Sequence, residues 1–391
     1  MAVCLVKLRR LTAFFSAFFI ISFACNFSFV SAQGKPDVSA SSAALMVVDT
    51  GELLFGKDAY TRRPMASTTK IMTSLIALEE QTPQREITVS ADMIQVEGTS
   101  MGLLDGDSVT LKTLVYGMLL QSGNDAANVT AIAVGGSVEN FVRRMNERAR
   151  EIGMKDTVFE TPSGLDSENH ASTAYDMALL GCTAMKNPEF VSICSQRSAA
   201  VYYGNPPYRR TLTNHNRLLW SYEGAIGIKT GFTKKSGRCL VSAAERDGVC
   251  LVAVTLNAPN DWNDHKAMFD YGFSIMELRQ IDYDISSLFL KVTGGERDRV
   301  GVELAETPTA VMHRDNDAEI RQEIFIKRFE YAPVEKGKIV GEARYYDGNN
   351  LLCTVPILTA EESARKKIEE PKQPENQSFF KRIIEKIRSF F

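Results

Sequence analysis

Three short motifs carry side chains that could perform acyl transfer: Ser67-Thr68-Thr69-Lys70, Ser122-Gly123-Asn124 and Lys229-Thr230-Gly231. In the first motif a hydroxyl and an amine stand three residues apart, and such positions share one face of a helix. A serine hydroxyl is a weak nucleophile until a nearby base takes its proton. Burial and a neighbouring cation lower the pKa of a lysine, so that it can be neutral and act as that base. The motifs therefore predict that Lys70 activates Ser67, with Lys229 as the neighbouring cation.

The other two motifs supply groups that the same reaction needs. The Ser122 hydroxyl could relay a proton to a leaving amine, and the Asn124 carboxamide could hold a substrate amide. Lys229 and Thr230 could bind a carboxylate, while Gly231 would let a substrate lie close to the strand. Each motif taken alone also fits an ordinary helix cap, helix end or strand turn. Their order, and their predicted settings in helix, loop and strand, favour one shared site.

The elements that must position these motifs form one predicted α/β domain, residues 38–277. A β-hairpin is expected over 44–55, and Ser67 is expected at the N-terminus of a helix that continues over 71–80. Further helices are expected over 110–120, 125–133, 138–152, 173–185 and 264–271, and strands over 225–231, 240–244 and 249–256, so that the third motif ends a strand. Because strands occur at both ends of this region, the sheet is expected to combine both ends around a helical block.

The rest of the chain predicts three further segments. Short alternating runs between Gly, Asp, Asn and Pro indicate a small all-β domain over 278–358, and residues 359–376 are expected to be a linker. Residues 377–391 suit an amphipathic helix on an anionic membrane surface, although a helix packed on its own protein is the alternative. One face of that helix would carry Phe379, Phe380, Ile383, Ile384, Ile387, Phe390 and Phe391, and the other Lys381, Arg382, Glu385, Lys386 and Arg388.

Charge and composition point to export. The basic residues Lys7, Arg9 and Arg10 precede an uncharged stretch and the small-residue site Val30-Ser31-Ala32, so residues 1–32 are predicted to be a signal peptide. An uncleaved signal anchor is the alternative.

The net charge of −3 over 391 residues argues against nucleic acid as a partner.

Cysteine usage gives no sign of a metal site and little sign of a disulfide framework. Five cysteines follow the leader: Cys182, Cys194, Cys239, Cys250 and Cys353. A hairpin centred on residues 245–248 would place Cys239 near Val254 and Cys250 near Ala243, which is out of register for a bridge. All five are expected to be buried and unpaired, with a single bridge as the alternative.

The motifs and their flanking segments resemble those of the low-molecular-mass D-alanyl-D-alanine carboxypeptidases, which are penicillin-binding proteins. The segments are Arg63-Pro64-Met65-Ala66 before the first motif, Thr161-Pro162-Ser163-Gly164-Leu165-Asp166, and Gly227-Ile228 with Phe232-Thr233 around the third. The resemblance implies a β-lactamase/transpeptidase-like catalytic domain with an antiparallel sheet and a helical block, followed by the small β-domain and the tail helix. It also implies a place at the outer face of the bacterial cytoplasmic membrane.

The resemblance also implies a role for each motif residue. Ser67 would be acylated by the penultimate D-alanine of a peptidoglycan stem peptide, with Lys70 as general base. Ser122 would be the proton relay and Asn124 the holder of the substrate amide, while Lys229 and Thr230, beside Gly231, would bind the terminal carboxylate. The oxyanion hole would be the backbone N–H groups of Ser67 and Phe232. D-alanine would leave, water would hydrolyse the acyl-enzyme, β-lactams would acylate the same serine, and no metal or organic cofactor is implied.

Two features leave alternatives open. Some relatives carry a histidine where this chain has Phe232, and the basic residue near the site could be His215, Arg217 or neither. A β-lactamase is the rival enzyme, but residues 155–175 contain no Glu-x-x-Leu-Asn stretch that would supply a glutamate for deacylation. A catalytically silent wall-binding protein is a rival of another class. Endopeptidase and transpeptidase activities would use the same acyl-enzyme.

Overall fold

The computed structural model describes residues 34–367 and 377–390 and divides into two units. Unit 1 comprises the chain up to Leu278 together with Val311–Asn316, and unit 2 comprises Arg279–Ala310 and the chain from Asp317 onward. The predicted signal peptide and part of the predicted linker, residues 368–376, lie outside the described residues. The fold class expected from the sequence, mixed α and β with antiparallel sheets, is confirmed.

Unit 1 is built on a five-stranded sheet in the order β2-β1-β9-β8-β7. Its strands are β1 (Ser42–Val47), β2 (Leu53–Lys57), β7 (Ala225–Thr233), β8 (Gly237–Arg246) and β9 (Val249–Leu256). Strand β1 pairs antiparallel with β9, Ser42 opposite Leu256, so the strands that come first and last along the chain in this sheet lie side by side. Strand β7, which carries the third motif, is an edge strand.

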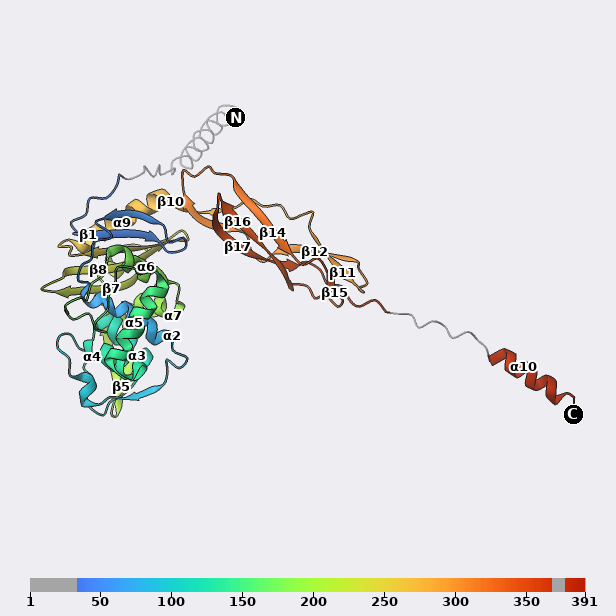
Figure 1. The fold of residues 1–391 in the computed structure, drawn as a ribbon, viewed down its shortest axis with the longest axis horizontal. Helices are drawn as coiled ribbons and strands as arrows, with labels where there is room; N and C mark the ends of the chain where they lie inside the picture. The colour runs from blue at the N-terminus through green and yellow to red at the C-terminus, as the bar shows by residue number, and fades with distance from the viewer. Residues whose placement is uncertain (1–33, 368–376, 391) are drawn as a thin grey trace, which may run out of the picture. The chain divides into compact units, whose positions relative to one another are not determined.

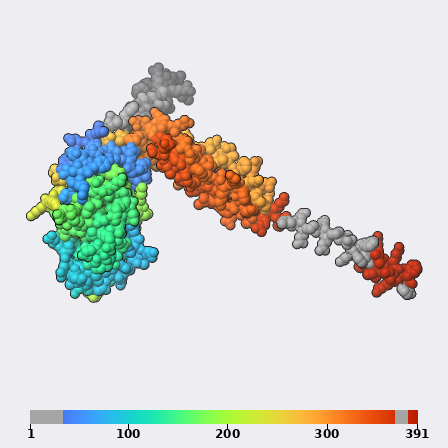
Figure 2. Space-filling view, viewed as in Figure 1, coloured from blue at the N-terminus to red at the C-terminus, as the bar shows by residue number. Residues whose placement is uncertain are grey.

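Helices cover both faces of this sheet (Figure 1). Helix α9 (Asp261–Ile275) packs on one face, and α6 (Ala174–Met185) leads the helical block on the other. The remaining helical segments are η1 (Ala66–Thr69), α2 (Lys70–Glu79), η2 (Ala91–Ile94), α3 (Leu111–Gln121), α4 (Asn124–Gly135), α5 (Val138–Ile152), α7 (Pro188–Cys194) and α8 (Leu218–Ser221). In the space-filling view the first strands, in blue, lie at one end of unit 1, and the green and cyan helical block makes the rest of the visible face (Figure 2).

The predicted helices are present, but the prediction missed α7 and a second sheet. That sheet has the order β3-β4-β5-β6, with β3 (Glu86–Thr88), β4 (Ser108–Thr110), β5 (Ser198–Gly204) and β6 (Pro207–Thr213). The caps explain why the helix bounds were close. For α5, the Ser137 side chain accepts from the Asn140 backbone, and Gly153 ends the helix in a left-handed conformation.

Two expectations about the strands were wrong. The third motif does not end its strand, because β7 continues to Thr233. The β8–β9 hairpin turns on Asp247 and Gly248 alone, both with positive φ, which is the two-residue turn that matches strand twist. The register therefore shifts by two residues, and Cys250 lies opposite Glu245 rather than near Ala243. The five cysteines are unpaired, as expected, with Cys182, Cys194 and Cys239 buried and the other two partly buried.

Unit 2 is all-β apart from its tail. Its sheet has the order β14-β16-β17-β12-β11-β15. The strands are β11 (Phe289–Thr293), β12 (Arg299–Leu304), β14 (Ile320–Ile326), β15 (Glu330–Tyr331), β16 (Ile339–Asp347) and β17 (Asn350–Thr359). Strands β10 (Met276–Gln280) and β13 (Thr309–His313) form a two-stranded sheet, and most of their residues belong to unit 1. Helix α10 of unit 2 spans Gln377–Arg388. Within the described ranges, no helix has the length and apolarity needed to cross a membrane.

Candidate active site

The first motif forms the junction between a short 3-10 turn and a helix. Ser67 lies in η1, and Lys70 is the first residue of α2, so the two side chains emerge from the same side of consecutive turns. The Lys70 Nζ atom lies 2.9 Å from Ser67 Oγ. The amine that the sequence places three residues away is therefore within hydrogen-bond distance of the hydroxyl.

Lys70 is fully buried, and its Nζ has two more oxygen partners. It donates to Asn124 Oδ1 at 2.7 Å and to the Ser163 carbonyl at 2.6 Å. Desolvation by burial and the nearby charge of Lys229 hold the pKa of Lys70 well below its usual range. A neutral amine has two hydrogens, which these two acceptors take, and its lone pair then faces Ser67 Oγ. This arrangement can remove the serine proton.

The second motif stands where α3 ends and α4 begins. Ser122 has a left-handed backbone (φ 60°) that ends α3, and Asn124 is the first residue of α4. The segment before them locks both residues in place. Asn124 donates through Nδ2 to the Glu97 carbonyl and through its backbone N–H to the Thr99 carbonyl, each at 2.7 Å, and Thr99 Oγ1 donates to the Ser122 carbonyl at 2.6 Å. The Asn124 oxygen is thereby oriented toward Lys70.

The third motif brings the edge of the sheet against the nucleophile turn. Lys229 is buried and donates to the Thr230 carbonyl at 2.7 Å, and desolvation lowers the pKa of its amine to about 7. Gly231 lies so close to the turn that a Cβ atom there would be 3.1 Å from the backbone nitrogens of Ser67 and Thr68. A side chain at position 231 would therefore crowd the backbone of the nucleophile.

A loop that sequence reasoning did not assign to the site completes it. Thr73 Oγ1 donates to the Pro162 carbonyl at 2.6 Å, and this loop supplies the Ser163 carbonyl that Lys70 binds. Gly164 has a φ of +85°, and a Cβ atom there would come within 2.0 Å of the Ala66 carbonyl oxygen. Only glycine fits this close approach. The loop belongs to a segment that resembles the family, but the sequence does not indicate which backbone carbonyl takes part in a site.

His170 ties the loop to the nucleophile turn through a buried chain of hydrogen bonds. Its Nδ1 accepts from the Glu160 backbone N–H at 2.9 Å, so Nε2 carries the hydrogen and donates to Thr69 Oγ1 at 2.9 Å. Thr69 Oγ1 in turn donates to the Ala66 carbonyl at 2.8 Å. Burial lowers the pKa of His170 to about 4, so the ring is neutral at neutral pH. A lone histidine gave no sign of this role in the sequence.

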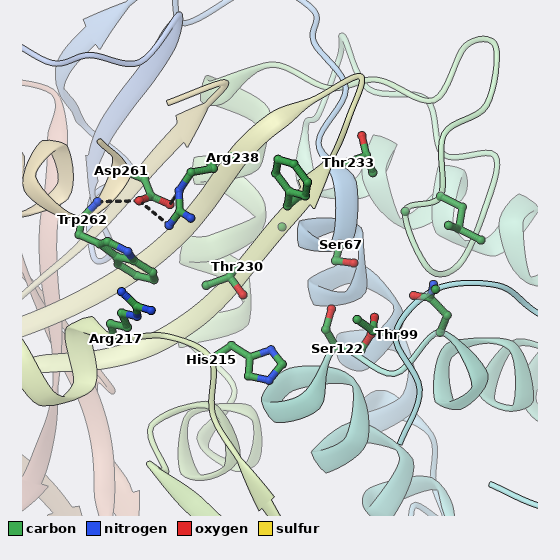
Figure 3. A pocket seen from close by; sticks show the side chains of 16 residues that line it. Ser67, Thr99, Ser122, His215, Arg217, Thr230, Thr233, Arg238, Asp261 and Trp262 are labelled. Atoms are coloured by element: carbon green, nitrogen blue, oxygen red, sulfur yellow. Dashed lines mark hydrogen bonds and ion pairs between the residues drawn. The ribbon is translucent and has the colours of Figure 1, made fainter. Parts of the chain in front are cut away.

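A cavity of about 440 Å³ opens over these groups (Figure 3). Ser67, Thr99 and Ser122 lie on one side of it, and Thr230 and His215 face them. Beyond strand β7 the cavity continues past Arg217 and Trp262 to the Arg238–Asp261 ion pair. Both candidate basic residues thus line the cavity, and burial with the Lys229 charge lowers the pKa of His215. The Phe232 side chain is 65% exposed.

Comparison with known proteins gives matches along most of the chain. A family profile described as D-alanyl-D-alanine carboxypeptidase matches residues 29–260, and one described as Penicillin-binding protein 5, C-terminal domain, matches residues 287–365. The D-alanyl-D-alanine carboxypeptidase DacF of Bacillus subtilis is 30% identical over 335 residues, which are 83% of this chain and 85% of that protein. DacB2 of Mycobacterium tuberculosis is 36% identical over 61% of this chain and 84% of its own length.

Solved structures agree with these matches. The Streptomyces K15 DD-transpeptidase has a TM-score of 0.60 and 31% identity, and the match covers 62% of this chain and all of that one. DacD of Francisella tularensis has a TM-score of 0.60 over 88% of this chain and 98% of its own. At 23% identity, that second likeness shows the fold alone.

We predict that His170→Ala slows acylation of Ser67 by a labelled penicillin at least about tenfold. The loss of two buried hydrogen bonds, each contributing about 1 kcal/mol, would free the loop that orients Lys70. Rates of gel-detected labelling would measure the effect.

His265→Ala is the matched control. This histidine is also buried and bonded to two hydroxyls, Ser242 Oγ on β8 and Thr255 Oγ1 on β9, so its side-chain bonds reach neither the loop at Ser163 nor the nucleophile turn. It should lower the thermal stability and leave the labelling rate unchanged. Equal slowing in both variants would show that His170 contributes only to stability.

Proposed function

We propose that this chain, which belongs to the D-alanyl-D-alanine carboxypeptidase family, is a serine-type carboxypeptidase that removes the terminal D-alanine from peptidoglycan stem pentapeptides. The family expected from the three motifs is confirmed. One observation carries the assignment to this site: Lys70 Nζ lies 2.9 Å from Ser67 Oγ, with its other two partners both acceptors.

The acylation step follows from that geometry. Neutral Lys70 takes the Ser67 proton as Oγ attacks the carbonyl carbon of the penultimate D-alanine. The carbonyl oxygen becomes an oxyanion and is bound by the backbone N–H groups of Ser67 and Phe232. The C–N bond then breaks, and the proton passes through Ser122 to the amine of the leaving D-alanine. The enzyme is left as an ester on Ser67.

Deacylation reverses the same proton path. Water enters the space left by D-alanine, gives a proton through Ser122 to neutral Lys70 and attacks the ester carbonyl carbon. The C–O bond to Ser67 breaks, and the serine recovers its proton. The products are the shortened stem peptide and the free enzyme, so no other reactant is needed.

Substrate recognition rests on the opposite wall of the cavity. A terminal carboxylate near Thr230 would accept from its hydroxyl and lie in the field of Lys229, with His215 and Arg217 at the same side (Figure 3). Asn124 Nδ2 is held by Glu97 and its oxygen by Lys70. Each of these atoms makes one bond there and can make a second, so a substrate amide could contact Asn124 with both bonds intact.

A penicillin would acylate Ser67 by the same route, and the cavity favours a persistent adduct over rapid turnover. Among the described residues that line it, the only carboxylate is Asp261, which Arg238 holds in a paired hydrogen bond. A class A β-lactamase needs a glutamate to activate the deacylating water. The lining of this cavity therefore supports the carboxypeptidase over the β-lactamase alternative.

Ser67→Ala should abolish both D-alanine release from a pentapeptide and the penicilloyl adduct. The reason is that the acyl bond forms on the Ser67 oxygen. Intact mass after penicillin treatment and a D-alanine assay would measure the two effects. Ser74→Ala, a buried hydroxyl deletion on helix α2, which directly follows the nucleophile turn, should retain both. D-alanine release by the Ser67 variant at the wild-type rate would rule out the mechanism.

The pH dependence of kcat/KM should be bell-shaped. Lys70 acts only when neutral, and its pKa is lowered, so the rate rises with pH as Lys70 loses its proton. Lys229 attracts the carboxylate only when charged, and its pKa is about 7, so the rate falls above that pH. Acylation by a penicillin methyl ester, which has no carboxylate, should lose the alkaline limb. An alkaline limb that persists with the ester would contradict the role of Lys229.

We further propose that α10 binds anionic lipid at the outer face of the bacterial membrane. Ile383, Ile384 and Ile387 are 40–58% exposed. Exposed apolar side chains that lie together on one helix are typical of a surface that binds another apolar surface. Lys381, Arg382, Lys386 and Arg388 supply the positive charge. The relatives compared here are bacterial, and the predicted signal peptide would deliver the chain across the membrane.

Replacing Ile383 and Ile387 together by aspartate should reduce co-sedimentation with phosphatidylglycerol vesicles at least about a hundredfold. Each buried isoleucine contributes about 1.5–3 kcal/mol of apolar transfer, and two are removed. Glu385→Gln, on the polar side of the same helix, should bind at least as well as the wild type. Unchanged sedimentation of the double variant would show that α10 is not the anchor.

A further inference from the structure

Unit 2 exposes two neighbouring aromatic rings at one end of its sheet. Phe329 is 46% exposed and Tyr331 is 66% exposed. Their rings meet edge to face, with centroids 5.3 Å apart. A soluble surface seldom gathers two large aromatic side chains without a use for them.

Basic residues from two distant segments surround this pair. Lys327 and Arg328 precede Phe329 directly, and both are exposed. The segment 365–367, Arg-Lys-Lys, is brought alongside by backbone hydrogen bonds. Lys366 N–H donates to the Gly294 carbonyl, and Ala332 N–H to the adjacent Thr293 carbonyl. The hollow between the segments has a volume of about 900 Å³ and is lined by Tyr331, Ala332, Thr293, Gly294 and residues 365–367.

The positive charge of this end is not cancelled by the acid beside it. Glu330 accepts from Lys327 at 3.0 Å and from Lys338 at 3.2 Å, and these bonds lower its pKa to about 2. The two lysines that bind Glu330 together carry one more positive charge than this carboxylate neutralises. Arg328 and the three residues 365–367 make no ion pair with another residue of the described ranges, so their charges face outward.

We propose that this surface is a second lipid contact, lying in the headgroup layer of the anionic membrane that α10 binds. We call it the aromatic–basic patch and define it as Lys327, Arg328, Phe329, Tyr331, Arg365, Lys366 and Lys367. Tyr331, whose ring carries a polar hydroxyl, is of a type enriched at the level of lipid headgroups, the apolar Phe329 ring adds buried area, and each basic residue near an anionic surface adds attraction. The inference rests on the proposed anchoring by α10.

Chain connectivity makes the second contact reachable. Lys367 and Gln377 are ten residues apart, and ten residues span at most about 36 Å in any conformation. A helix α10 lying on lipid therefore keeps Lys367, one member of the patch, within about that distance of the surface. A single tether would let unit 2 turn freely, whereas a second contact at one end of its sheet would fix which end faces the lipid.

Tryptophan quenching by brominated lipid tests the contact in the full chain. Phe329→Trp places a reporter in the patch, and Phe289→Trp is the matched control. Phe289 is also an exposed aromatic, 52% exposed, but it begins β11, about 13 Å along the strand from Thr293. With vesicles of brominated phosphatidylglycerol, the added emission at 329 should fall at least twofold and that at 289 should not. The two native tryptophans, Trp220 and Trp262, give the same background in both variants.

Sedimentation of the same samples separates this inference from the anchoring on which it rests. A chain that does not sediment with vesicles refutes the anchoring. A chain that sediments while residue 329 stays unquenched refutes the patch alone, as does quenching of equal size with brominated phosphatidylcholine. An emission shift at 329 with isolated peptidoglycan and none with lipid would also overturn the proposal and assign the patch to the wall.

A charge reversal gives an independent measurement. Replacing Arg365, Lys366 and Lys367 by glutamate in the Phe329→Trp chain should abolish most of the quenching while sedimentation persists through α10. The substituted residues are exposed and bond only through their backbone, so unit 2 should keep its fold, and its thermal unfolding would check this. Quenching that survives the reversal would contradict the proposal.

Discussion

The site depends on one buried amine, Lys70 Nζ, surrounded by oxygen atoms from three separate parts of the chain. An ammonium ion removed from water loses much solvation energy, and no carboxylate contacts it to compensate. The nearest acid, Asp125, uses its oxygens on the backbone N–H groups of residues 101–103 and on Ser100. The neutral amine is therefore the favoured form, and a neutral amine beside a hydroxyl is a base.

Much of unit 1 can be understood as the framework that this amine requires. The break between α3 and α4 delivers the Asn124 oxygen, and the loop at Ser163 delivers a backbone carbonyl oxygen. Strand β7 brings a second amine near enough to oppose protonation of the first. Ser122 and Gly164 both have a positive φ, and these local conformations let their segments come close to the nucleophile turn and Lys70.

What could be predicted from sequence follows a physical division. The side chains that could react or bind a substrate stand in short motifs with a typical spacing, and the structure brings them into or beside one cavity. They are Ser67, Lys70, Ser122, Asn124, Lys229 and Thr230. The long helices also have a strong period and clear caps. Ser163 acts through its backbone and His170 through a contact 101 residues away, so neither has a local pattern. The second sheet joins two three-residue strands, β3 and β4, to the distant hairpin β5–β6, and the β8–β9 register depended on the left-handed pair Asp247-Gly248.

Strand β7 has a consequence beyond the lysine and glycine that it carries. Among the strands of the described residues it pairs with β8 alone, so alternate peptide groups point away from the sheet, on the side of the nucleophile turn. Exposed strand edges recruit other extended chains, and proteins usually block them. Here the edge borders the cavity, where an extended peptide would meet main-chain groups that can accept it as an added strand. Peptides or inhibitors that cannot extend would lose these main-chain bonds whatever their side chains offer.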